Sequence, residues 1–123
     1  AEKIAAGDID GGLAFFMDAL EGPGAWKRIP ATPKQLLRDN AMTLIGQTRD
    51  KRPPFSKADA QSIKMPTLFI GGANTKGMLP MVLHALAENV PDARTVMIPN
   101  TTHPMFEQAP VAYCEAVLDF LTT

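Results

Sequence analysis

The segment that most constrains the fold of this chain is the apolar run at residues 67–70 (TLFI), which is followed directly by Gly71-Gly72. Such a short apolar run predicts a β-strand covered on both faces, and the glycines allow a sharp turn at its end. A helix opened by Pro80 is expected next, and residues 94–98 then predict a second short strand. Strand, helix and strand in this order predict a parallel sheet with a helical crossover, so the expected fold class is α/β.

A parallel sheet of two strands is not stable by itself, and no third strand is predicted in the chain. At least one edge of the strand at residues 67–70 would be an unpaired, apolar ladder. We therefore expect one of two arrangements at this edge. Either another polypeptide segment extends the sheet, or the chain associates with itself.

Residues 1–52 are predicted to be helical. Asp8 is a suitable N-cap for a helix, and apolar residues at helical spacing follow it: Ile9, Leu13, Phe16 and Leu20. The segment GPG at residues 22–24 is expected to end this helix. Thr32, Pro33 and Gln35 predict a capping box at the start of a second helix. Its buried stripe is expected to comprise Leu36, Leu37, Ala41, Leu44 and Ile45.

The polar, proline-broken segment at residues 50–54 (DKRPP) is typical of a linker. It separates the helical segment, residues 1–52, from a second segment, residues 53–123, in which strands and helices alternate. The last helix is expected to begin near Pro110 and to bury an apolar stripe of Val111, Cys114, Val117, Leu118 and Leu121.

Composition excludes several classes of function. Hydrophobic residues make up 46% of the chain and charged residues 20%, as in a globular core, and the formal net charge is −1. No charge run points to nucleic acid or to a membrane surface, and no apolar run is long enough to span a bilayer. A single cysteine provides neither a disulfide framework nor a metal cluster, so we expect a reducing, cytoplasmic compartment. Without a phosphate loop or a dinucleotide turn, we expect no metal or organic cofactor.

A histidine follows the second predicted strand, at the end of the loop PNTTH, residues 99–103. Glu107, Pro110 and a helix ending in VLDFL, residues 117–121, come after it. This ordered set resembles the C-terminal end of an α/β-hydrolase, in which the loop after the last strand carries the catalytic histidine. Residues 1–52 resemble the remainder of a helical cap, and residues 53–123 resemble the end of the core domain. The resemblance implies a partial α/β-hydrolase fold: two parallel strands flanked by helices and preceded by a cap segment.

The resemblance implies that His103 is a general base, which takes a proton from the nucleophile or from water and returns one to the leaving group. The alternative is a loop histidine that faces solvent. The family's acid usually follows the penultimate strand, where this chain has Asn74. Either the acid follows an earlier strand outside this chain, or Asn74 serves in a weakened triad, or Asn74 is a turn residue that tolerates a left-handed backbone.

The nucleophile is expected to lie outside this chain. Neither Ser56 nor Ser62 is in a G-x-S-x-G turn, and Ser56 is instead expected to cap a helical turn with Asp59. Cys114 is expected to be buried and unreactive on the last helix. A substrate pocket of mainly apolar character is predicted from five side chains: Met78, Leu79, Met105, Phe106 and Trp26.

Two functions are compatible with these observations. The first is the C-terminal fragment of an enzyme that hydrolyses an ester, or a related C–O, C–C or C–halogen bond, in an apolar small molecule. Such a fragment is inactive alone and needs the missing N-terminal half of the hydrolase. The alternative is a non-catalytic, hydrolase-like module that binds a partner or associates with itself, which the missing nucleophile and Asn74 both favour.

Overall fold

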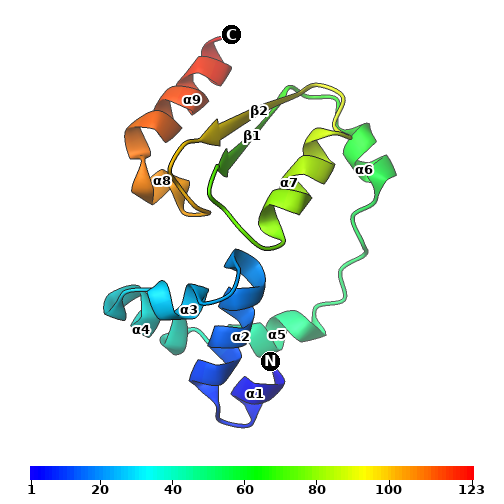
Figure 1. Ribbon diagram of the computed structural model, residues 1–123. Coiled ribbons are helices and arrows are strands. Elements are labelled where there is room, and N and C mark those ends of the chain that lie inside the picture. Colours follow the sequence, from blue (N-terminus) through cyan, green and yellow to red (C-terminus); the bar gives the residue numbers. More distant parts are fainter. The chain divides into compact units, whose positions relative to one another are not determined.

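The computed structural model describes all residues of the chain, 1–123, and divides them into two compact units, Ala1–Pro54 and Phe55–Thr123. The division falls at the end of the proline-broken segment. Nine helices and one sheet of two parallel strands make up the structure (Figure 1), which confirms the α/β class. None of the helices is both long and apolar enough to cross a membrane.

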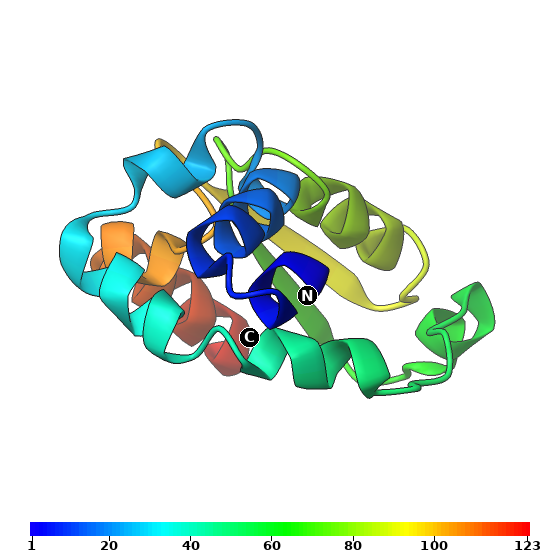
Figure 2. The ribbon, with the colours of Figure 1, turned by 90° about the horizontal axis from the view of Figure 1, so that it is seen from below.

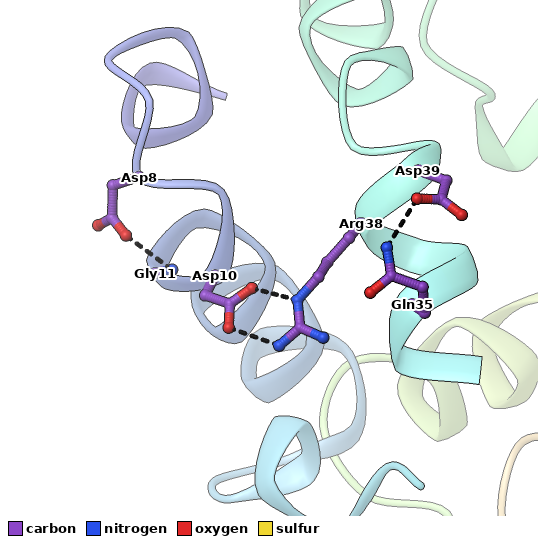
Figure 3. A network of polar contacts seen from close by, with 6 residues as sticks. All are labelled: Asp8, Asp10, Gly11, Gln35, Arg38 and Asp39. Carbon is purple, nitrogen blue, oxygen red and sulfur yellow. Dashed lines mark hydrogen bonds and ion pairs between the residues drawn. The ribbon is translucent and has the colours of Figure 1, made fainter. Parts of the chain in front are cut away.

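The first unit contains five helices: α1 (Glu2–Ala5), α2 (Ile9–Glu21), α3 (Ala25–Arg28), α4 (Ala31–Asp39) and α5 (Thr43–Arg49). Its core is formed by Ile4, Leu13, Trp26 and Ala41. The prediction that Asp8 caps α2 is confirmed, because its carboxylate accepts the backbone N–H of Gly11 at 2.9 Å (Figure 3). Figure 3 also shows the two-pronged contact that joins α4 to α2, in which Arg38 donates to both oxygens of Asp10 at 2.7 Å.

The predicted capping box at Thr32 is wrong. Helix α4 begins two residues earlier than predicted, at Ala31, and its N-cap is Pro30, whose backbone is extended. The carbonyl of Pro30 accepts the N–H of Lys34 at 3.0 Å and so starts the helix before Thr32. Gln35, the other expected member of the box, donates instead to Asp39 at 2.8 Å.

The second predicted helix is in fact two helices, α4 and α5. Asn40 lies between them, and its side-chain amide donates to the carbonyl of Leu36 at 2.8 Å. The hydroxyl of Thr43 donates to the carbonyl of Asn40 at 2.7 Å. Such local side-chain hydrogen bonds compete with the helical ladder and end it. Ala41 is buried as expected, but Leu36 is 64% exposed and does not belong to the buried stripe.

The second unit comprises α6 (Lys57–Ser62), β1 (Thr67–Gly72), α7 (Leu79–Ala87), β2 (Ala93–Ile98), α8 (Met105–Gln108) and α9 (Pro110–Thr122). The strands are parallel, in a register that runs from Thr67 opposite Ala93 to Gly72 opposite Ile98. Helices α7 and α9 cover opposite faces of this sheet (Figures 1 and 2). The predicted capping of α6 by Ser56 with Asp59 is confirmed as a complete capping box.

Strand β1 is paired on one side only. The N–H of Thr67 donates to Asp92 and that of Ala73 donates to Ile98, so the odd-numbered residues of β1 direct their backbone groups toward β2. The backbone N–H and C=O groups of Leu68 and Ile70 therefore point to the open edge. Residues 67–70 are half-buried, which corrects the expectation that this strand is covered on both faces.

The expected buried stripe on α9 is largely exposed. Val111, Leu118 and Leu121 are exposed, and so is Cys114, which was expected to be a buried packing residue. Asp119 on the polar flank of α9 pairs with Arg94 of β2, and the sheet covers the neighbouring face of the helix. A sheet of two strands is too narrow to cover a second apolar face of the same helix. The side chains of this exposed stripe therefore have no neighbour within the second unit to pack against.

Candidate functional site

An apolar pocket of about 340 Å³ lies in the second unit, at the C-terminal ends of the two strands. Its walls come from the end of β1, from α7 and from the loop and short helix that follow β2. The lining residues are Phe69, Ile70, Gly71, Gly72, Thr75, Leu79, Pro80, Val82, Leu83, Leu86, Met97, His103, Met105 and Phe106. Histidine and threonine are the two polar side chains among them.

The loop that carries His103 lies directly against the end of β1. The N–H of Asn74 donates to the carbonyl of Thr101 at 2.8 Å, and the buried hydroxyl of Thr101 donates to the carbonyl of Ile98 at 2.9 Å. A β-carbon at Gly72 would overlap the carbonyl oxygen of Thr102. Only glycine permits this close approach of two backbone segments. The strand end and the histidine loop are thus held together as one structural unit.

Gln108 at the end of α8 holds the same loop from the other side. Its side-chain oxygen accepts the N–H of Thr102 at 2.7 Å, and its side-chain nitrogen donates to the hydroxyl of Thr102 at 2.9 Å. Both bonds lie next to His103 in the chain. Sequence reasoning emphasised Glu107 and missed Gln108, because nothing in the local pattern distinguishes two adjacent polar residues on a short helix.

His103 lines the pocket but is an exposed residue, as the alternative of a solvent-facing loop histidine predicts, and its imidazole makes no hydrogen bond within the chain. Asn74, which occupies the position considered for the triad acid, is exposed and does not line the pocket. Its contact with the histidine loop is made by its backbone N–H. The non-glycine residue with a left-handed backbone is Asn100, with φ of 59°, and not Asn74.

The five predicted pocket residues fall into two groups. Leu79, Met105 and Phe106 line the pocket beside His103. Met78 is 51% exposed and lies outside the lining. Trp26 belongs to the core of the first unit, where it is 8% exposed and the ammonium of Lys34 lies 4.9 Å from the centre of its ring.

Thr75 is a pocket residue that sequence reasoning missed. Its hydroxyl oxygen is buried and has no hydrogen-bond partner in the chain. No group of three or more His, Cys, Asp or Glu side chains is placed to hold a metal ion.

No protein-family model matches this chain, and comparisons with curated proteins and with solved structures also find no match.

Proposed function

We propose that this chain is the C-terminal part of an α/β-hydrolase and supplies the general base, His103, to a nucleophile on another segment. The observation that carries the proposal is the position of this histidine at the C-terminal ends of parallel strands, on the wall of an apolar pocket. Open α/β sheets bind their ligands at this end. The reaction class is hydrolysis of an ester, or of a related C–O, C–C or C–halogen bond, in an apolar molecule.

The chemistry asked of His103 is proton transfer. A neutral imidazole accepts the proton of the nucleophile or of an attacking water, and the imidazolium then protonates the leaving group. Gly72 and Gln108 fix the backbone on both sides of the loop. A fixed loop would keep the imidazole of His103 in one orientation for proton transfer. In this proposal the acid that orients the imidazole follows an earlier strand, because Asn74 is exposed and is not among the pocket-lining residues.

The partner in this proposal is the missing N-terminal half of the hydrolase, which contains the nucleophile. It would add a strand at the open edge of β1, where the backbone groups of Leu68 and Ile70 are unpaired. An extended chain is the structure whose N–H and C=O groups repeat at the spacing such an edge requires. Residues 1–54 would then serve as the helical cap.

The test is to read the gene upstream of the codon for Ala1 and to express the longer product. We expect a strand, a tight G-x-S-x-G or G-x-D-x-G turn and a helix, and hydrolysis of p-nitrophenyl butyrate. The change His103→Ala should then reduce kcat by at least about a hundredfold, as expected for loss of a general base. His84→Ala is the matched control, because His84 is an exposed histidine on α7 outside the pocket lining. If His103→Ala and His84→Ala hydrolyse the ester at equal rates, the proposal is wrong.

The second candidate is a non-catalytic module that associates with itself. It is favoured by the open edge of β1 together with the exposed apolar side chains of α9. A longer gene product without esterase activity, combined with stable dimers of the chain itself, would make this the better account.

A further inference from the structure

The two free edges of the sheet differ in how they are protected. Charged residues on an edge strand commonly prevent pairing with another chain. Strand β2 carries Arg94, which pairs with Asp119 of α9, whereas β1 has no charged residue within Thr67–Gly72. Pro66, directly before β1, has no N–H and limits any added ladder to the strand itself. Strand β1 therefore presents a short, unprotected edge.

The register of the sheet shows which face each side chain of β1 occupies. Leu68 is opposite Arg94, which contacts α9, so Leu68 and Ile70 lie on the α9 face. Phe69, between them in the chain, lies on the α7 face because side chains alternate along a strand. The backbone groups of Leu68 and Ile70 are also the ones that point to the open edge.

The exposed apolar stripe of α9 includes the flank of this helix that is turned toward the same edge. Asp119 contacts β2 through Arg94 and so marks the flank toward β2. At about 100° per residue, Cys114 and Leu121 lie about 140° and 160° around the helix from Asp119, on the flank toward β1. Both are exposed, Leu121 at 71%. A chain that pairs with β1 therefore also comes next to this flank of α9.

Strand and helix spacings suit a second copy at this edge. Helix α9 packs on one face over both strands (Figures 1 and 2). Neighbouring strands lie about 4.8 Å apart, so a two-fold axis between two β1 strands puts the two α9 helices two strand spacings, or roughly 10 Å, apart. Packed helices lie about 8–10 Å apart. One symmetry axis perpendicular to the sheet thus pairs the strands and brings the two apolar flanks together.

We propose that β1 pairs antiparallel with β1 of a second copy, about a two-fold axis at Phe69. In this register Leu68 exchanges backbone hydrogen bonds with Ile70 of the second copy, and Ile70 with its Leu68, so each unpaired group gains a partner. The two Phe69 side chains lie directly opposite, as a stabilising aromatic pair. No like charges meet, since Lys64 comes opposite Asn74 of the second copy.

This dimer does not rest on the proposed function. In a longer product the missing half of the hydrolase would take the same edge, so the dimer belongs to the chain on its own. Its tests use the chain alone. Turnover by the longer product and its His103→Ala variant tests the proposed function separately.

Hydrogen exchange of the unmodified chain, measured by NMR at low and high concentration, tests the paired edge. The amides of Leu68 and Ile70 should exchange at least about tenfold more slowly once sedimentation shows dimers, because they then enter a ladder. The amides of Phe69 and Gly71 face β2 and are the internal control, so their exchange should change much less. A chain that stays monomeric, or a dimer in which all four amides respond alike, would overturn the proposal.

Disulfide trapping tests the position of the axis. In a Cys114→Ser background, which removes the single natural cysteine, Phe69→Cys should form a linked dimer, because directly opposite β-carbons lie about 4.5–5.5 Å apart. Thr67→Cys is the matched control on the same strand and face. Its two copies would lie four residue positions apart along the strands, roughly 13 Å, which a disulfide cannot bridge. Equal linking of the two variants would exclude this register.

Discussion

Gln108 and Thr102 form a reciprocal pair: the backbone N–H of Thr102 donates to the side-chain oxygen of Gln108 at 2.7 Å, and the side-chain nitrogen of Gln108 donates to the Thr102 hydroxyl at 2.9 Å. The pair closes the loop that carries His103. Removing it with Gln108→Ala should cost about 1 kcal/mol, because each such bond has a modest net value at an exposed position. Urea unfolding measures the loss, and the ring signals of His103 in NMR spectra should broaden.

Gln108→Glu is the control for this pair, because a carboxylate still accepts the N–H of Thr102. It should restore most of the stability and the sharp His103 signals. If Gln108→Ala leaves both unchanged, the pair does not hold the loop.

The contact between Gly72 and the histidine loop predicts a large effect of a single methyl group. In Gly72→Ala the new β-carbon would overlap the carbonyl oxygen of Thr102, which is backbone and has little freedom to move. We expect a loss of about 3 kcal/mol, at the upper end of the range for overpacking. Gly46→Ala is the matched control, because nothing lies within 4 Å of the β-carbon it adds in α5. That change should stabilise the chain by about 0.5–1 kcal/mol through helix propensity. Similar changes in the free energy of unfolding for Gly72→Ala and Gly46→Ala would contradict the close approach at Gly72.

Asp18 predicts a pH dependence of stability in the first unit. Hydrogen bonds from the backbone N–H groups of Trp26 and Gly24 lower the pKa of its carboxyl below the ordinary value of 3.8. A lowered folded-state pKa means that the stabilisation is complete above pH 3.8 and is lost as the pH falls through the folded-state pKa. Asp18→Asn should therefore lower the thermal midpoint at pH 7, and its difference from the unmodified chain should shrink in acid. If the difference in thermal midpoint between Asp18→Asn and the unmodified chain does not shrink as the pH is lowered, this mechanism is excluded.

The open edge and the exposed stripe of α9 predict that the isolated chain associates with itself. Sedimentation velocity at increasing concentration should show dimers or larger species. Leu118→Lys should shift the equilibrium toward monomer without loss of stability, because Leu118 is 60% exposed. Met65→Lys is the control, since Met65 is 66% exposed and lies outside α9. A chain that is monomeric at every concentration, or equal effects of the two changes, would argue against association through α9.

Much of the secondary structure was predictable because it depends on neighbours in the sequence. Asp8 and Ser56 each accept a backbone N–H three residues on, as predicted. The same reasoning was wrong at Thr32 because Pro30, two residues earlier, provides a competing start for the helix. The parallel pairing of the two strands also followed from the order of elements.

The candidate site was predictable only in part. His103, Leu79, Met105 and Phe106 follow or flank strand ends, and all of them line one pocket. Thr75 and Gln108 were missed, because an unpaired hydroxyl or a reciprocal amide pair depends on which groups lie nearby in space. No periodicity or spacing in the sequence predicts the unpaired hydroxyl of Thr75 or the pairing of Gln108 with Thr102.

The sequence by itself determined the longer helices α2, α7 and α9 and the parallel sheet, because these follow from local hydrogen bonding and hydrophobic periodicity. Only the tertiary structure decided which apolar faces are buried and which polar groups meet. Helix α9 makes the reason plain: Val117 and Leu118 are adjacent and equally apolar, yet Val117 is half-buried and Leu118 is exposed. Burial requires a neighbouring element, and the sheet of two strands covers only one side of that helix.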